Sequence, residues 1–147
     1  KFLDTKCDYM STEYPKTFPL GFAVEVFSFE ALEKSWNEAR LPSEREHVTP
    51  YMIKSKTLFK HSNYSHSENL SHIRCTVDTD FDFRLIEQII SKINLRPIYL
   101  SHILELYGKE QSIFEINSHV KHDGYERSLK EDEEYLKKVE NEYEKTN

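Results

Sequence analysis

Apolar and polar residues alternate along two stretches of the chain, which is typical of strands with one buried face. The first stretch is 19–27, where Glu25 falls on the polar side, and the second is 70–77. A shorter segment at 56–62 predicts a third, brief strand. Residues 1–18 show no helical pattern, so an extended segment with turns is expected there.

Apolar residues at helical spacing predict five helices, and the order of strand followed by helix indicates the α/β class. The expected bounds are 29–39, 42–54, 80–94, 99–107 and 126–147. Ser28 offers a hydroxyl cap for the first helix, and Pro42 suits the first turn of the second. Thr79 and Asp82 have the spacing of a capping box at the start of the third. Gly108 is expected to end the fourth.

The apolar stripes of these helices predict which faces are buried. The stripe of the first helix is Phe29, Leu32 and Trp36, and that of the third is Phe83, Ile86, Ile90 and Ile93, supported by Ile89. The last segment, 126–147, is almost entirely charged and carries only a thin stripe. We therefore expect one domain over 1–125, followed by a charged, mostly solvated C-terminal helix over 126–147.

The composition narrows the class of protein. The 20 Lys and Arg against 26 Asp and Glu give a formal net charge of -6 with no basic run, which argues against non-specific nucleic-acid binding. No stretch holds the roughly 18 consecutive apolar residues that a membrane span needs. The two cysteines, Cys7 and Cys75, are too few for a disulfide framework. We interpret them as free thiols of a cytoplasmic protein.

Glu44, Arg45, Glu46 and His47 are consecutive at the start of the second predicted helix. Because residues i and i+3 share a helix face, Glu44 and His47 can point the same way. A carboxylate beside an imidazole could hold an anionic or sugar ligand. The alternative is an ordinary helix start with local ion pairs on the surface, and the pattern alone favours this alternative.

Asp78 follows the predicted strand 70–77 and stands at the N-terminus of the next helix. Ligands of open α/β sheets bind at this edge, and a carboxylate there suits Mg²⁺, which prefers oxygen ligands. Alternatively, Asp78 or Thr79 only caps the helix. Two interpretations are also open for Glu25, whose side chain either lines a cleft or faces solvent. The seven histidines show no spacing typical of a zinc site.

Several segments, taken in order, resemble the cytidylyltransferase-like family that includes spore-coat polysaccharide biosynthesis proteins and is related to the CMP-sugar synthetases. The matching stretches are Asp8-Tyr9, VEVFSFEALEKSW (24–36), LPSEREHVTPY (41–51), LSHIRCTVDTDFDF (70–83) and EINSHVKHDGYERSLKEDE (115–133). The combination of LPSEREHVTPY with a downstream TVDT is the specific part. Two positions depart from the family's pattern, since members often carry Asp where Ala23 stands and Pro where Asp80 stands.

The resemblance implies a partial Rossmann-like nucleotidyltransferase sheet with flanking helices and a helical C-terminus. It also implies that 1–125 is the C-terminal half of a nucleotide-diphospho-sugar transferase-like domain, without the half whose loop holds CTP. The implied reaction of the intact protein joins CTP to an acidic or activated sugar and releases pyrophosphate, in surface polysaccharide biosynthesis. We expect this half to be inactive by itself.

By the same resemblance, Asp78 would be a ligand of Mg²⁺, and no residue of this half is expected to be catalytic. The residues expected on the sugar or phosphate side are Glu25, Glu44, Arg45, His47 and Arg74. The implied assembly is a homodimer that takes a nucleotide and a sugar and binds neither nucleic acid nor membrane. The alternative is a non-catalytic dimerisation or interaction module.

Overall fold

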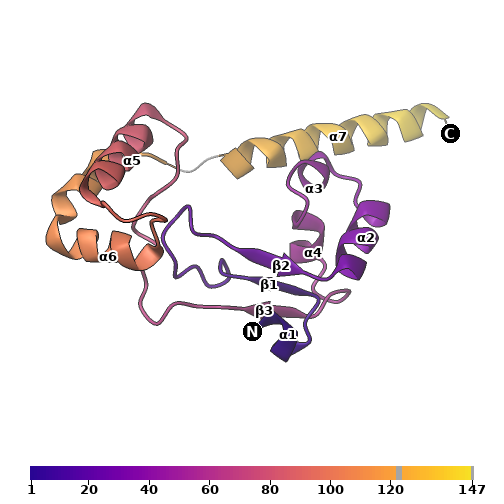
Figure 1. Ribbon diagram of the computed structural model, residues 1–147. Helices are drawn as coiled ribbons and strands as arrows, with labels where there is room; N and C mark the ends of the chain where they lie inside the picture. Colours follow the sequence, from indigo (N-terminus) through magenta and orange to yellow (C-terminus); the bar gives the residue numbers. More distant parts are fainter. Residues whose placement is uncertain (122–123, 147) are drawn as a thin grey trace. The chain divides into compact units, whose positions relative to one another are not determined.

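The computed structural model describes residues 1–121 and 124–146, without the side chains of 124–127 and 144–146 (Figure 1). The chain divides into two compact units. The first unit contains residues 1–11, 25–63 and the C-terminal helix, and the second contains residues 12–24 and 64–121. Each unit has a hydrophobic cluster of its own.

The first unit is built on a three-stranded sheet. Its strands are β1 (Tyr9–Ser11), β2 (Glu25–Phe27) and β3 (His61–Asn63), in the order β2-β1-β3. β1 pairs antiparallel with β2 and parallel with β3. All three residues of the central strand are buried, and Tyr9 packs with Ala31, Met52 and Phe59 to form the core of this unit.

The first unit also contains several helices, the last of which packs against the short helix that begins at Pro42. They are α1 (Phe2–Thr5), α2 (Phe29–Glu38), α3 (Pro42–Glu46), α4 (Pro50–Lys54) and α7 (Gly124–Thr146). The predicted cap of α2 is confirmed, because Ser28 Oγ accepts the backbone N–H of Ala31. The single helix expected over 42–54 is wrong. Val48 takes a φ of 68°, and Pro50, which has no N–H to donate, begins a new helix.

The second unit is mainly helical. Its helices are α5 (Asp80–Lys92), α6 (Leu100–Lys109) and the 3₁₀ helix η1 (Gln111–Asn117). Leu85 and Ile89 of α5 pack with Ile103 and Leu106 of α6 and with Phe114 of η1. α6 continues past Gly108 to Lys109, so the expected end at that glycine is wrong.

Two of the predicted strands are mostly not strands in the described structure. Only Glu25–Phe27 of the stretch 19–27 is a strand, and 70–77 contributes a single isolated bridge. Gly21, at a φ of +100°, turns the chain where a straight strand was expected. The alternation does not match burial in either stretch. Val24, Val26 and Val77 are 54%, 40% and 57% exposed, whereas the neighbours Ile73 and Arg74 are both buried.

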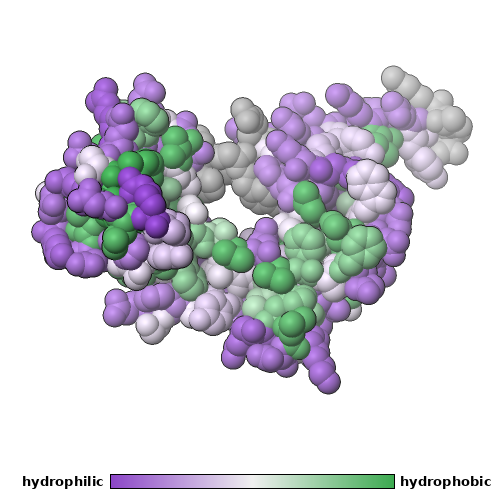
Figure 2. Space-filling model, viewed as in Figure 1, coloured by the Kyte–Doolittle hydropathy of each residue, from purple (hydrophilic) through white to green (hydrophobic). Residues whose placement is uncertain are grey.

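α2 buries a different face from the predicted stripe. Ala31 and Ser35 are buried, whereas Phe29 and Trp36 are 72% and 68% exposed. Figure 2 shows hydrophobic residues at the surface of this unit. Ala31 packs in the core of this unit and Leu32 packs against that core, whereas the largest apolar side chains of α2 stay outside.

α5 is also rotated relative to its predicted stripe, of which only Ile89 and Ile93 are buried. It buries Asp82, Leu85 and Ile89, whereas Phe83 and Ile90 are 53% and 48% exposed. The reason is a buried carboxylate, because Asp82 points inward to a partner that the helical pattern does not reveal.

The expected α/β class is confirmed, with a small sheet and flanking helices. α7 is a helix of 23 residues whose side chains are mostly exposed where described. Within the described residues, no helix is both long enough and apolar enough to cross a membrane.

Candidate functional site

Arg74, in the second unit, joins a buried carboxylate to an exposed one. Its side chain is only 8% exposed. Nε donates to Asp82 Oδ1 at 2.8 Å, and Nη2 donates to Asp82 Oδ2 at 3.0 Å. The same Nη2 donates to Asp78 Oδ2 at 2.8 Å. The guanidinium thus forms a bidentate pair with the Asp82 carboxylate, and the second hydrogen of Nη2 bonds to Asp78.

Asp82 is fully buried and surrounded by donors. Its Oδ1 also accepts a hydrogen bond from Asn117 Nδ2 at 2.7 Å. Its Oδ2 accepts the backbone N–H groups of Asp78 and Thr79 at 3.1 and 3.0 Å, and the predicted capping box is confirmed. Arg74 above all, helped by these other donors, holds the pKa of Asp82 well below its usual range. Asp82 therefore anchors the start of α5.

Asp78 lies immediately before α5, with its side chain 57% exposed. One exposed carboxylate fits the donor chemistry of Mg²⁺, which proteins usually hold with one or two carboxylates beside water and substrate phosphates. No group of three or more His, Cys, Asp or Glu in the described part of the chain is placed to hold a metal ion. Asp78 is therefore the one ligand of the predicted Mg²⁺ site that the described residues would supply.

Glu25 begins β2 and is exposed, yet both of its carboxylate oxygens have partners. The Tyr9 hydroxyl donates to Oε1, and the Thr49 hydroxyl donates to Oε2 at 3.1 Å. Tyr9 is almost completely buried and gives this contact a rigid base. A carboxylate fixed at two points can still accept hydrogen bonds from the hydroxyl groups of a ligand.

Glu44 and Arg45 line a pocket of about 330 Å³ between α2 and α3. The rest of its lining is Leu32, Ser35, Trp36 and Val48. The Arg45 guanidinium carbon lies 4.1 Å from the centre of the Trp36 ring, a cation–π geometry. Glu44 is buried, and its Oε2 accepts the backbone N–H groups of Arg40 and Leu41. Glu44 therefore holds the start of α3, while Arg45 stands on the exposed rim.

His47 is tied to the C-terminal helix. Its Nε2 lies 2.8 Å from the hydroxyl oxygen of Ser128 in α7, and that hydroxyl donates to Glu46 Oε2 at 2.9 Å. The imidazole also lies 3.6 Å from the Glu46 carboxylate. His47 thus pairs with Glu46 and Ser128, whereas the carboxylate of Glu44 is engaged at the start of α3.

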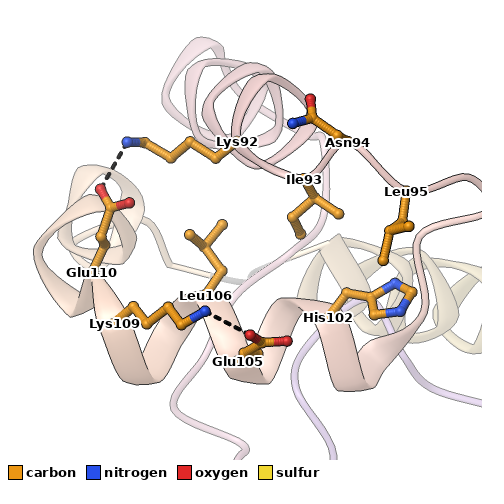
Figure 3. A pocket seen from close by; sticks show the side chains of 9 residues that line it. All are labelled: Lys92, Ile93, Asn94, Leu95, His102, Glu105, Leu106, Lys109 and Glu110. Carbon is orange, nitrogen blue, oxygen red and sulfur yellow. Dashed lines mark hydrogen bonds and ion pairs between the residues drawn. The ribbon is translucent and has the colours of Figure 1, made fainter.

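A second pocket of about 330 Å³ lies in the second unit between the end of α5 and α6 (Figure 3). Its lining is Lys92, Ile93, Asn94, Leu95, His102, Glu105, Leu106, Lys109 and Glu110. Lys92 Nζ lies 2.7 Å from Glu110 Oε2, and Lys109 Nζ lies 2.6 Å from Glu105 Oε1. Because these cations are already paired with carboxylates, the rim offers little selection for a charged ligand. None of the predicted site residues lines this pocket.

The sequence did not indicate several hydrogen-bond partners of the site residues. Tyr9 lies 16 positions from Glu25, Asn117 lies 35 from Asp82, and Ser128 lies 81 from His47. No local pattern can connect residues so far apart. These residues and Thr49 all lie within stretches that carry the family resemblance, but the resemblance assigned them no role.

Comparison with known proteins supports the relationship suggested by these motifs. No protein-family model matches the chain. The chain is 38% identical over 125 residues to the uncharacterized protein MJ1063 of Methanocaldococcus jannaschii, a match that covers 84% of this chain and 50% of that protein. It is also similar to a solved cytidylyltransferase from Leptospira borgpetersenii serovar Hardjo-bovis, with a TM-score of 0.71 and 30% identity.

The structural match covers 78% of this chain and 48% of the Leptospira chain. The chain therefore spans about half the length of each of these two relatives. Its mixed α/β fold is similar to that of a cytidylyltransferase, and the expected cytidylyltransferase-like relationship is supported at this level.

Proposed function

We propose that the chain is the C-terminal portion of a sugar cytidylyltransferase, which forms a CMP-sugar and pyrophosphate from CTP and an acidic or activated sugar. The observation that carries this proposal is the similarity to a cytidylyltransferase at a TM-score of 0.71 and 30% identity. The exposed Asp78 carboxylate, at the end of TVD and oriented by Arg74, adds a candidate metal ligand. The half that binds CTP would lie outside these residues.

The reaction is an attack of a sugar hydroxyl on the α-phosphorus of CTP, with pyrophosphate as the leaving group. Mg²⁺ bound at Asp78 would neutralise charge on the phosphates. Glu25, fixed by Tyr9 and Thr49, would accept hydrogen bonds from sugar hydroxyls. Arg45 and His47 would face an acidic group of the sugar. This is catalysis by positioning and electrostatics.

Two of the proposed site residues would act mainly through their neighbours. Glu44 would hold the start of the helix that carries Arg45, because its carboxylate caps that helix. Arg74 would orient Asp78 and contribute positive charge on the phosphate side. The proposed setting is cytoplasmic synthesis of a surface polysaccharide such as that of a spore coat, which rests on the motif resemblance.

The test is a chimera in which this chain replaces the matching part of the Leptospira cytidylyltransferase. Pyrophosphate release is measured with CTP, Mg²⁺ and a panel of acidic and activated sugars. We expect turnover with at least one sugar and a loss of about 10²-fold or more in Asp78→Ala, the scale for one charge-stabilising group. A folded chimera without turnover, or an Asp78→Ala variant with full turnover, would contradict the proposal.

The second candidate is a non-catalytic dimerisation module, and the exposed apolar side chains of α2 favour it. Phe29 and Trp36 lose little of their surface in the single chain. A homodimer that covers them would also suit the enzyme, and α7 would then be an appended, largely solvated segment. Sedimentation at several concentrations tests this, because a dimer through α2 should dissociate in Phe29→Ser/Trp36→Ser and persist in the control Tyr143→Ser.

A further inference from the structure

The two oxygens of Asp78 differ in their surroundings. Oδ2 accepts the Nη2 hydrogen of Arg74 at 2.8 Å, while the carboxylate as a whole remains 57% exposed. A cation that approaches Asp78 therefore meets one oxygen already engaged by a guanidinium. We propose that Arg74 makes Asp78 a one-oxygen ligand and thereby favours Mg²⁺ over Ca²⁺. This inference rests on the proposed function, because it takes Asp78 to be the metal ligand.

The two ions differ in how they use a carboxylate. Mg²⁺ requires a nearly ideal octahedron, keeps several waters and takes a single oxygen from each carboxylate. Ca²⁺ accepts six to eight oxygens in flexible geometry and often binds both oxygens of one carboxylate. A guanidinium held against Oδ2 hinders a cation from binding both oxygens at once. This costs Mg²⁺ nothing in coordination, whereas Ca²⁺ loses a contact.

The Arg74 guanidinium is held firmly beside Asp78 because its other hydrogen bonds prevent it from rotating away. Its Nε and Nη2 grip the fully buried Asp82, which is in turn held by Asn117 Nδ2 at 2.7 Å. Asn117 Nδ2 also donates to the Arg74 carbonyl oxygen at 3.2 Å. Rotation of the guanidinium would leave the buried Asp82 carboxylate without its main partner, which is strongly unfavourable.

Charge and geometry can be separated experimentally. The positive charge of Arg74 weakens the binding of any divalent cation at Asp78, and it does so about equally for Mg²⁺ and Ca²⁺. The ratio of the two affinities therefore reports the geometry alone. A change in that ratio on altering Arg74 is a signature that general destabilisation would not produce.

The experiment uses the whole chain and needs no turnover. Mn²⁺ is titrated while the paramagnetic broadening of the backbone amide signals of residues 77–80 is followed, and Mg²⁺ or Ca²⁺ is then added as competitor. Arg74→Lys keeps the charge but loses the two-pronged fork. We expect the ratio of Ca²⁺ to Mg²⁺ affinity to rise about fivefold, which corresponds to about 1 kcal/mol.

Two further variants sharpen the result. Asn117→Ala loosens Arg74 without altering its guanidinium and should shift the ratio in the same direction by less, so the test survives if Arg74→Lys does not fold. Asp80→Asn removes a charge from the same turn and should weaken both ions without changing the ratio. The amide spectrum of each variant shows whether it is folded.

The outcomes distinguish this inference from the proposed function. If Mn²⁺ broadens no signals near Asp78 in the native chain, both the metal assignment and the inference fail. If it does, but the ratio is unchanged in folded Arg74→Lys and Asn117→Ala, only the inference fails. A shifted ratio combined with an inactive chimera would overturn the proposed function and leave the selection of the ion by Arg74 intact.

Discussion

Asp132 of α7 caps the N-terminus of α3 through Ser43, a residue 89 positions earlier in the chain. Asp132 Oδ1 accepts the backbone N–H of Ser43 at 2.8 Å, and Oδ2 accepts its hydroxyl at 2.6 Å. The residue at the usual capping position is Leu41, whose side chain has no acceptor. The helix that ends the chain thus supplies the acceptor that α3 lacks. Burial by itself raises the pKa of Asp132, and the bonds from Ser43 together with the nearby Lys54 ammonium more than offset this, so the pKa is lowered overall.

The first prediction concerns this cap. Asp132→Ala should lower the free energy of unfolding by about 1–3 kcal/mol, because it leaves the buried N–H of Ser43 without an acceptor. Urea titration measures the change, and amide hydrogen exchange along α7 should accelerate at the same time. Glu133→Ala, one position further at an exposed site, is the matched control. Equal effects of the two substitutions would show that the cap contributes nothing.

The second prediction concerns pH. The folded pKa of Asp82 lies below its unfolded value of about 3.9, because Arg74 and the other donors favour the carboxylate. A lowered folded pKa stabilises the fold above the unfolded pKa, and this contribution is lost as the pH falls further below that value. The free energy of unfolding should therefore fall below about pH 4.

Asp82→Asn isolates this contribution. The variant should be less stable at pH 7, and its stability should depend less on pH in the acid range, because the titrating group is gone. Asp80→Asn, which removes an exposed carboxylate from the same first turn, should retain most of the native pH dependence. The measurement is urea unfolding at a series of pH values. An unchanged acid slope in Asp82→Asn would contradict the role assigned to its carboxylate.

Local signals in the sequence predicted the helix starts well. Ser28 and the pair Thr79 and Asp82 cap α2 and α5 as expected, because a cap depends on residues within one turn. The rotation of α5 could not be predicted in this way. It follows from the bond between Asp82 and Arg74, and the helical pattern alone assigns a carboxylate to the outside.

Strands were harder to predict than helices because strand pairing joins distant residues. β1 was missed, although its three residues are the buried centre of the sheet, since a run of three gives no period to detect. The segments 19–24 and 70–77 alternate as strands do, yet the first turns at Gly21 and the second forms only an isolated bridge through Arg74. The candidate site shows the same limit, because TVDT pointed to Asp78 whereas nothing near Asn117 in the sequence indicated its bond to Asp82.

The third prediction concerns Gly21, whose φ of +100° is unfavourable for other residues. A Cβ at this position would lie 2.7 Å from the carbonyl oxygen of Cys75. Gly21→Ala should therefore lower the free energy of unfolding by about 1–3 kcal/mol through backbone strain alone, with the clash adding to it. Gly108→Ala is the control, because a Cβ there meets no atom within 4 Å and lies in α6. That control should be stabilised by about 0.5–1 kcal/mol.

The fourth prediction concerns the reactivity of Cys75. Burial raises the pKa of its thiol to about 11, since a thiolate is poorly solvated there. At pH 8 only about one molecule in a thousand would carry the reactive thiolate. Cys7 is buried as well, and both cysteines are free thiols. Native chain treated with iodoacetamide at pH 8 should therefore be modified slowly at both cysteines, as mass spectrometry of the intact chain would show.

Whether burial causes the slow modification of the two cysteines is tested by running the same reaction in urea. Unfolding removes the burial, so both thiols should then react at the rate of an ordinary exposed cysteine. Cys7→Ser leaves Cys75 as the only thiol and allows its rate to be measured alone across pH 7 to 10. A native Cys75 that reacts as fast as the unfolded one would show that the segment after Arg74 is open to solvent. In that case the firm attachment of Arg74 beside Asp78 would also be in doubt, because both residues lie on the same short stretch of backbone.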